Sequence, residues 1–165
     1  MSFNAIGKDG ATAIAQAITN NKTLKQLYIN NCEITSTGAT AIANSLLHNT
    51  SLEELGMSYN AIGKDGATAI AQAITNNKTL KQLLLYGDDT IDTIDDTIDT
   101  IDDTIDTIDE QSAMIIMRSL HHNNSITTLL LPLTLKYNDN VKREVEHINS
   151  TRRKCNIQEL QVIYA

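Results

Sequence analysis

The sequence predicts an α/β solenoid, in which short strands alternate with helices and similar units stack on one another. Residues 1–27 and 57–83 are identical apart from Phe3, which is replaced by Tyr59 in the second copy. A leucine also recurs every 28 residues, at Leu27, Leu55 and Leu83. Such internal periods are typical of repeat architectures, because one strand–helix unit cannot bury its apolar face alone and stacking buries it.

Each 28-residue unit contains a strand pattern. Apolar residues alternate with other residues over a few positions, which predicts a short strand with one buried face. We expect each strand to centre on the recurring leucine. The alternating pairs are Leu27-x-Ile29, Leu55-x-Met57 and Leu83-x-Leu85.

Each unit also contains a helix pattern. In ATAIAQAI, Ile14 and Ile18 lie four residues apart with Ala between them, which gives a short helix one apolar stripe. Asp9 precedes the pattern and places a negative charge near the positive helix end. Residues 20–21, both Asn, follow it, and we expect them to stop the helix in a left-handed conformation. The expected helices are residues 10–19, 38–47 and 66–75.

A fourth unit is displaced by an insertion. Residues 112–129 align with the third unit, but Leu129 lies 46 residues after Leu83, which is 18 more than one period. The extra residues belong to the heptad DDTIDTI, which occurs three times in residues 88–108. We expect a helix near residues 112–122 and a strand near Leu129.

The acidic insertion, residues 88–110, holds ten Asp, one Glu and no basic residue. Its isoleucines recur at spacings of three and four, the rhythm of a coiled coil, but Asp and Thr are poor helix formers. This favours a flexible or partly helical product of tandem duplication. An Ile-striped helix lying on the solenoid or on a partner is one alternative. A cation site is another, although the segment lacks the Gly and the terminal bidentate Glu of an EF-hand loop.

The C-terminal residues leave the 28-residue frame. VKREVEHINSTRR predicts a helix with Val141, Val145 and Ile148 on one face, and IQELQVIYA predicts a last strand. A more polar terminal unit that closes the core is what a solenoid requires. We expect a single domain over residues 1–165, divided into repeats (1–87), the insertion (88–110), the displaced repeat (111–135) and a closing unit (136–165).

The spacing of apolar residues also resembles a known repeat. The first unit reads Leu24-x-x-Leu27-x-Ile29-x-x-Cys32-x-Ile34, and the next repeats it with Leu52, Leu55, Met57, Asn60 and Ile62. This resembles the leucine-rich repeat signature. The 28-residue unit with G-A-x-A-I-A resembles the ribonuclease-inhibitor-like subclass, which also forms the sensor end of NOD-like receptors. The resemblance covers about residues 2–87 and 111–135 and implies a horseshoe segment with parallel strands inside and helices outside.

Composition argues against several classes of partner. The net charge is −7, but eleven of the 20 acidic residues lie in the insertion, which leaves nine against 13 basic residues elsewhere. Without a basic stripe interleaved with aromatics, we expect no nucleic-acid binding. No apolar run approaches the roughly 18 residues of a membrane span. The N-terminal MSFNAIGKDG is not a signal peptide, so we expect a cytoplasmic protein that does not bind membranes.

Cofactor and catalytic motifs are also missing from the sequence. There is no G-x-S-x-G, P-loop or pair of metal-spaced His residues. Cys32 and Cys155 lie far apart without a CxxC, which favours reduced thiols. His48, His121 and His122 fall at helix ends, where a cation suits the helix dipole. We therefore expect no enzyme activity, no cofactor and no metal site.

Asparagine recurs at one position of the units. Asn-x-Ser/Thr triplets begin at Asn21, Asn49, Asn77, Asn123 and Asn149. The first four share the turn from helix to strand, and this spacing indicates a structural role in that turn rather than glycosylation.

The remaining candidate for function is the concave strand face. Side chains between the buried strand positions should point to it: Gln26, Tyr28, Asn30, Glu54, Gly56, Ser58, Gln82, Leu84 and Tyr86. We place Tyr28 and Tyr86 on one column with Ser58 between them. Tyr is enriched at protein interfaces, and Leu84 adds an apolar contact.

We therefore predict a non-catalytic module that binds a protein partner through these residues, as a fragment or relative of a NOD-like-receptor-type sensor. A ribonuclease-inhibitor-like protein, a GTPase regulator and a solvated face without a ligand remain alternatives.

The N-terminal end is a second candidate surface. Met1 aligns with Met57, a buried strand position, so the first unit begins within a repeat and no polar cap precedes it. We expect this end to self-associate or to fray over residues 1–20.

Overall fold

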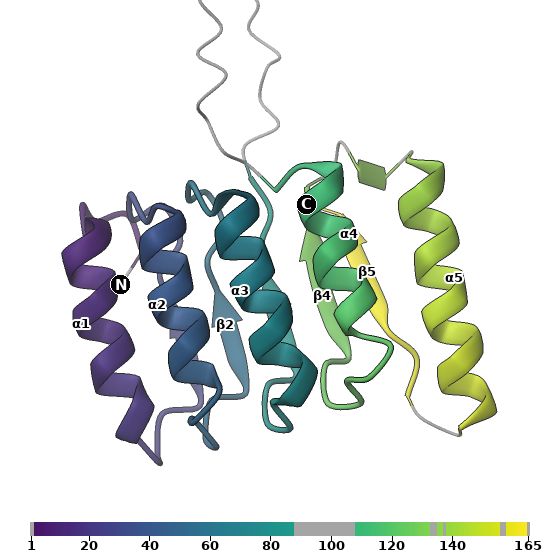
Figure 1. The fold of residues 1–165 in the computed structure, drawn as a ribbon, viewed down its shortest axis with the longest axis horizontal. Coiled ribbons are helices and arrows are strands. Elements are labelled where there is room, and N and C mark those ends of the chain that lie inside the picture. The colour runs from purple at the N-terminus through teal and green to yellow at the C-terminus, as the bar shows by residue number, and fades with distance from the viewer. Residues whose placement is uncertain (1, 88–107, 133–134, 137, 156–157, 165) are drawn as a thin grey trace, which may run out of the picture.

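The strands and helices alternate in a computed structural model that describes residues 2–87, 108–132, 135–136, 138–155 and 158–164 (Figure 1). The helices are α1 (Gly7–Asn20), α2 (Ser36–Leu46), α3 (Gly63–Asn76), α4 (Glu110–Ser119) and α5 (Asp139–Lys154). The strands are β1 (Gln26–Tyr28), β2 (Glu54–Gly56), β3 (Gln82–Leu84), β4 (Thr128–Leu131) and β5 (Gln161–Tyr164). The predicted α/β solenoid is confirmed.

The five strands form one parallel sheet in the order β1-β2-β3-β4-β5. The 28-residue period sets the register, so the recurring leucines lie side by side across the strands, followed by Val162. All five helices cover the same face of the sheet (Figure 1). We call the opposite face, which is the predicted concave surface, the helix-free face.

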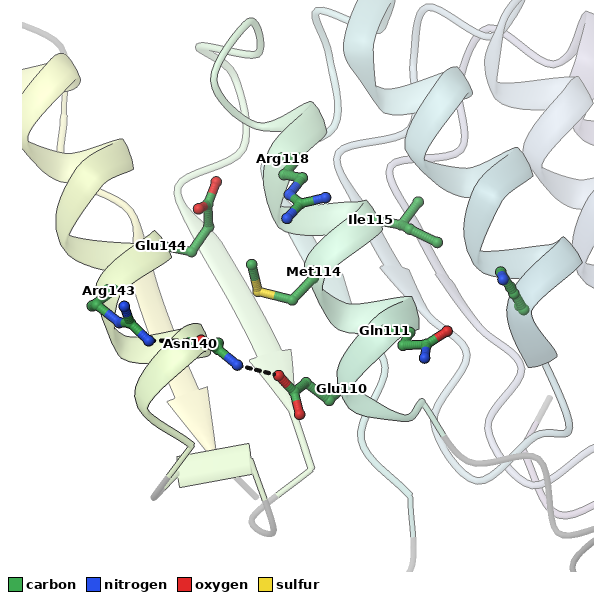
Figure 2. A pocket seen from close by; sticks show the side chains of 9 residues that line it. Glu110, Gln111, Met114, Ile115, Arg118, Asn140, Arg143 and Glu144 are labelled. Carbon is green, nitrogen blue, oxygen red and sulfur yellow. Dashed lines mark hydrogen bonds between the residues drawn. The ribbon is translucent and has the colours of Figure 1, made fainter.

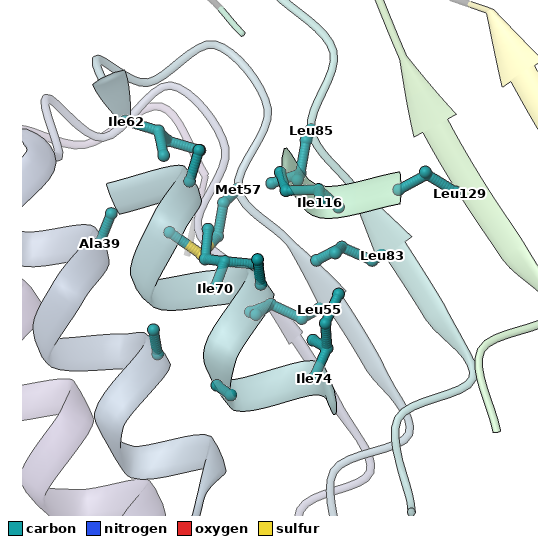
Figure 3. Close-up of a cluster of buried hydrophobic side chains, with 14 of the residues drawn as sticks. Ala39, Leu55, Met57, Ile62, Ile70, Ile74, Leu83, Leu85, Ile116 and Leu129 are labelled. Atoms are coloured by element: carbon teal, nitrogen blue, oxygen red, sulfur yellow. The ribbon is translucent and has the colours of Figure 1, made fainter. Parts of the chain in front are cut away.

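The core lies between the sheet and the helices. Leu55 and Leu83 from the strands meet Ile70 and Ile74 from α3, with Ile116 of α4 on the far side (Figure 3). All five side chains are fully buried. Each unit is therefore stabilised mainly by apolar contact with its neighbours, as expected for a solenoid.

Helices α1 and α3 begin earlier than predicted. Gly7 and Gly63 have φ angles of 59° and 60°, a left-handed conformation that glycine adopts at little cost. The chain turns into the helix at these glycines, so Asp9 lies within the first turn of α1 instead of before it. The charge still lies near the positive helix end.

The predicted left-handed stop after these helices is wrong. Asn21 and Asn77 have extended backbones, with φ angles of −72° and −69°. Their side chains redirect the chain instead, because the Asn77 Oδ1 accepts hydrogen bonds from the backbone N–H groups of Thr79 and Leu80 at 2.9 and 2.8 Å. Asn21 accepts equivalent bonds in the first unit.

The same asparagines connect neighbouring units. The Asn77 Nδ2 donates to the carbonyl oxygens of Leu46 and Asn49, at 2.9 and 3.3 Å, in the preceding unit. Asn49 and Asn123 make the corresponding bonds one unit earlier and one unit later. The predicted structural role in the turn is thus confirmed.

The fourth unit resumes its frame at Ile108, slightly earlier than predicted. Ile108 is buried in the core at the position of Ile62. Asp109 then caps α4, since its carboxylate accepts a hydrogen bond from the Ser112 N–H at 2.7 Å. The predictions for residues 88–107 lie outside the described residues.

The C-terminal segment forms the predicted last helix and strand, α5 and β5. The Arg152 side chain is buried, and its Nη2 donates to the carbonyl oxygen of Asn123 at 2.8 Å. Asn149 fixes the last turn by exchanging two hydrogen bonds with the backbone of Leu160. Within the part of the chain that the structure describes, no helix combines the length and apolar character needed to cross a membrane.

Candidate protein-binding face of the sheet

The helix-free face carries the strand side chains that point away from the core. The strand register orders them into rows that run across the sheet. We call the middle one the central row; its members are Tyr28, Gly56, Leu84, Leu130 and Ile163. Leu84 and Leu130 are partly exposed, and Ile163 is 46% exposed. The central row is therefore an apolar stripe across all five strands.

Tyr28 is held in place at one end of the central row. A Cβ atom on Gly56 would lie 2.6 Å from the Tyr28 Cδ1, so the ring lies over the space that glycine leaves open. The Tyr28 hydroxyl donates a short hydrogen bond to the Glu54 carboxylate. This bond, with desolvation and the charge of Glu54, raises the pKa of Tyr28, so the phenol stays protonated.

A polar row lies beside the central row. It contains Gln26, Glu54, Gln82, Thr128 and Gln161. Gln26 and Gln161 are exposed, and the other three are partly exposed. The helix-free face therefore offers hydrogen-bonding groups along one side of an apolar stripe.

The predicted column of Tyr28, Ser58 and Tyr86 does not exist. Tyr86 lies 58 residues after Tyr28, two more than two periods, so it falls in the next row with Asn30 and Ser58. Ser58 is only 1% exposed and cannot contact a partner. Asn30 is partly used within the fold, because its Oδ1 accepts a hydrogen bond from the Ser58 N–H at 2.9 Å. Tyr86 is partly exposed and packs edge-on against Tyr59, with ring centroids 5.2 Å apart.

Sequence reasoning missed two members of the central row, Leu130 and Ile163. The signal was available for Leu130, because it follows Leu84 by the same 46 residues that separate Leu129 from Leu83. Ile163 has no such signal, since the last strand leaves the 28-residue frame and only the β4–β5 register places it beside Leu130.

Charges collect where the strands begin. The Glu53 carboxylate lies between the ammonium groups of Lys81 and Lys25, and the Lys25 Nζ is 2.9 Å from its Oε1. Hydrogen bonds from Lys81 and Lys25 lower the pKa of Glu53 from 4.5 to about 2. Glu53 therefore stays ionised at neutral pH, and its carboxylate is already paired with both lysines.

The histidines at the end of α4 also form contacts within the fold. The His121 Nε2 lies 2.7 Å from the Glu144 Oε1 of α5, and the His121 and His147 rings are 4.8 Å apart. No group of His, Cys, Asp or Glu side chains in the described ranges is arranged to hold a metal ion.

Comparisons with known proteins agree with this fold. The Leucine Rich repeat family matches residues 1–15, 20–43 and 48–71. A solved structure of the Leiomodin-1 Actin-Binding Site 2 superposes with a TM-score of 0.68 and 19% identity, covering 94% of this chain and 82% of that one. The tropomodulin C-terminal domain from Caenorhabditis elegans gives a TM-score of 0.65 and 12% identity, covering 94% and 84%. No curated protein sequence matches the chain.

These matches do not single out the NOD-like receptors, so the resemblance holds at the level of the repeat. Leucine-rich repeats are matched within residues 1–71, and the chain shares the fold of the tropomodulin and leiomodin repeat domains.

Proposed function

We propose that this chain is a non-catalytic module that binds another protein through the helix-free face of its sheet. The central row is the observation that carries the proposal. It presents Leu84, Leu130 and Ile163 to solvent in register, next to the ring of Tyr28. An apolar stripe with a polar border is the usual anatomy of a protein interface.

The bond between Tyr28 and Glu54 supports the same proposal. Binding costs less entropy when an interface side chain is already fixed before the partner arrives. The ring of Tyr28 lies over Gly56 and its hydroxyl is held by Glu54, so this side chain is fixed in the free protein. Tyrosines of this kind are frequent among the residues that dominate binding energy.

The identity of the partner is a finer part of the proposal. Leiomodin-1 carries an actin-binding site on this fold. At 19% identity the likeness extends to the fold alone, and it makes actin the first purified protein to test. The narrower roles of a NOD-like-receptor-type sensor, a ribonuclease-inhibitor-like protein or a GTPase regulator rest on the sequence resemblance. A cytoplasmic location remains part of the proposal.

Capture from cell extract tests the proposal. The immobilised 165-residue chain is compared with Leu84→Glu, which places a charge in the central row, and with Asn44→Glu. Asn44 is exposed on α2, on the other side of the sheet, and its substitution changes the net charge equally. We expect specific proteins to be retained by the parent and by Asn44→Glu, and lost from Leu84→Glu at unchanged circular dichroism.

Retention that survives Leu84→Glu would contradict the helix-free face as the binding surface. A parallel titration with purified actin decides the partner. If actin binds the parent and Leu84→Glu weakens this binding at least about tenfold, actin is supported as the partner. If actin does not bind at about 100 μM, actin is excluded, and the result of the capture experiment still stands.

A further inference from the structure

The outer face of α4 differs from those of the three helices before it. Three outward positions carry small or polar side chains in the earlier units: Thr12, Ala13 and Gln16; Thr40, Ala41 and Asn44; Thr68, Ala69 and Gln72. In α4 the same positions hold Met114, Ile115 and Arg118. Two of the three have become large and apolar, and one has become a cation. Met114 and Ile115 pack against the core on their inner side, and both leave part of a larger apolar side chain open to solvent where the earlier units carry Thr and Ala.

These three residues line a groove of about 590 Å³ that lies over α4, with Lys64 of α3 on one side and residues of α5 on the other (Figure 2). Met114 points from α4 into the space toward α5, and Ile115 faces the side of α3 (Figure 2). Both side chains are only partly buried. The groove therefore has an apolar floor that is accessible from solvent.

The composition of α5 accounts for the space between α4 and α5. A Cβ atom on Gly38 would lie 2.9 Å from the Ala11 Cβ, and one on Gly66 would lie 2.9 Å from the Ala39 Cβ. These small residues let α1, α2 and α3 pack closely. The sequence of α5 contains neither Gly nor Ala, so its bulkier side chains cannot approach α4 in this way.

The charges around the groove favour an anionic occupant. The side chains of Lys64 and Arg118 are exposed and have no hydrogen-bond or ion-pair partner among the described residues. Arg143 donates to the Asn140 Oδ1 and to a backbone carbonyl, so its charge is not neutralised there.

The two carboxylates of the lining already have partners. The Asn140 Nδ2 donates to Glu110 at 2.7 Å, and Glu144 contacts His121 at 2.7 Å. Hydrogen bonds from Asn140 and Asn138 also lower the pKa of Glu110. The lining therefore holds three cations and two carboxylates, and its net positive charge favours an anionic ligand.

We propose that this groove binds an acidic amphipathic helix of a partner protein. Its apolar side chains contact Met114 and Ile115, and its carboxylates pair with Lys64, Arg118 and Arg143. An apolar helix face in a groove between two helices is a recurrent mode of recognition. Methionine suits such a floor because its side chain adapts to different shapes. The surrounding charges add selectivity for acidic sequences.

The test uses the full chain and a fluorescent peptide of three heptads, with Leu at the a and d positions and Glu elsewhere. We expect saturable binding that weakens at least about tenfold in Arg118→Glu and in Met114→Ala. A control variant, Lys78→Glu, makes the same change of charge at an exposed site on the turn after α3 and should bind as the parent does. A control peptide with Ser in place of Leu keeps the charge and should bind at least about tenfold more weakly.

Three results would overturn this proposal. If Lys78→Glu and Arg118→Glu weaken peptide binding equally, only the overall charge of the protein determines the affinity. Equal binding of the Ser peptide would show that the apolar floor does not contribute. A variant that lacks residues 90–107 and binds the peptide at least about tenfold more tightly than the parent would assign the groove to the chain's own acidic insertion instead of a partner.

Discussion

Asn77 shows how one side chain joins two units of the solenoid. Its oxygen accepts from the turn of its own unit, and its nitrogen donates to two carbonyl oxygens of the preceding unit. The side chain is buried, so each of these groups would lack a partner without it. The Asn21 Oδ1 accepts the same two backbone hydrogen bonds, but the Asn21 Nδ2 has no acceptor among the described residues.

This contrast gives a matched pair of variants. Asn77→Asp keeps the acceptor but replaces the donor with an oxygen that faces two carbonyl oxygens, and we expect a loss of about 3 kcal/mol in the free energy of unfolding. Asn21→Asp makes the same change where no donor is used, and we expect a change within about 0.5 kcal/mol. Urea denaturation measures both values. Equal losses would mean that the bonds between units contribute little.

Glu53 makes stability depend on pH at the edge of the sheet. Its pKa is lowered in the folded chain, so the contribution is fully present above its ordinary value of 4.5 and is lost as the pH falls toward about 2. We expect Glu53→Gln to show a smaller loss of melting temperature between pH 5 and pH 2 than the parent. Because the group is exposed, high salt should weaken the difference. Parallel pH curves of the two proteins would contradict this assignment.

Helices α1 and α3 show what a neighbouring unit contributes, because the two have the same sequence. Ile70 is fully buried in α3, whereas its counterpart Ile14 is only partly buried in α1. Leu80 is fully buried, and its counterpart Leu24 is 37% exposed. The outer side of α1 is therefore an exposed apolar surface in the described chain, and such surfaces favour association.

We expect the 165-residue chain to self-associate at micromolar concentration through this surface. Ile14→Glu should give a monomer in sedimentation experiments, while Gln16→Glu, an exposed polar site on the same helix, should behave as the parent does. A parent chain that is monomeric, with slowly exchanging amides at Ile14 and Ile18, would refute the expectation.

Most elements could be predicted from the sequence because the period is strict. The leucine of each unit has the same neighbours, so strand position and register follow from the 28-residue spacing. The residues at which the helices begin could not be predicted as well. The start of α1 depends on the left-handed conformation of Gly7, and the period does not say which residue of the unit adopts it. The row of Tyr86 could have been predicted from the period, because Tyr86 lies two residues beyond the position that is two periods after Tyr28.

The groove over α4 was not predictable. Met114, Ile115 and Arg118 can be read from the alignment of units, but the width of the space depends on how far α5 stays from α4. That distance follows from the packing of the whole closing unit, including the buried Arg152, and not from a local pattern.

At the scale of the whole molecule, the 18 residues in excess of one period leave the register of the sheet intact, since β3 and β4 pair as β2 and β3 do. Ile108 belongs to the core, so a deletion that restores the period should keep it. We expect a variant lacking residues 90–107 to be at least as stable as the parent, because a shorter connection costs less entropy to close. Differential scanning calorimetry checks this, and a clear drop in melting temperature would show that the insertion packs on the repeats.

The helix-free face is the central claim, and photo-cross-linking in cell extract tests it most directly. A photoreactive amino acid replaces Leu84 in the central row or, in a second protein, Asn44 on the outer face of α2. We predict that the chain labelled at Leu84 cross-links to the same protein that the parent chain captures, and that the chain labelled at Asn44 does not. Cross-links to that protein from Asn44, with none from Leu84, would contradict the claim.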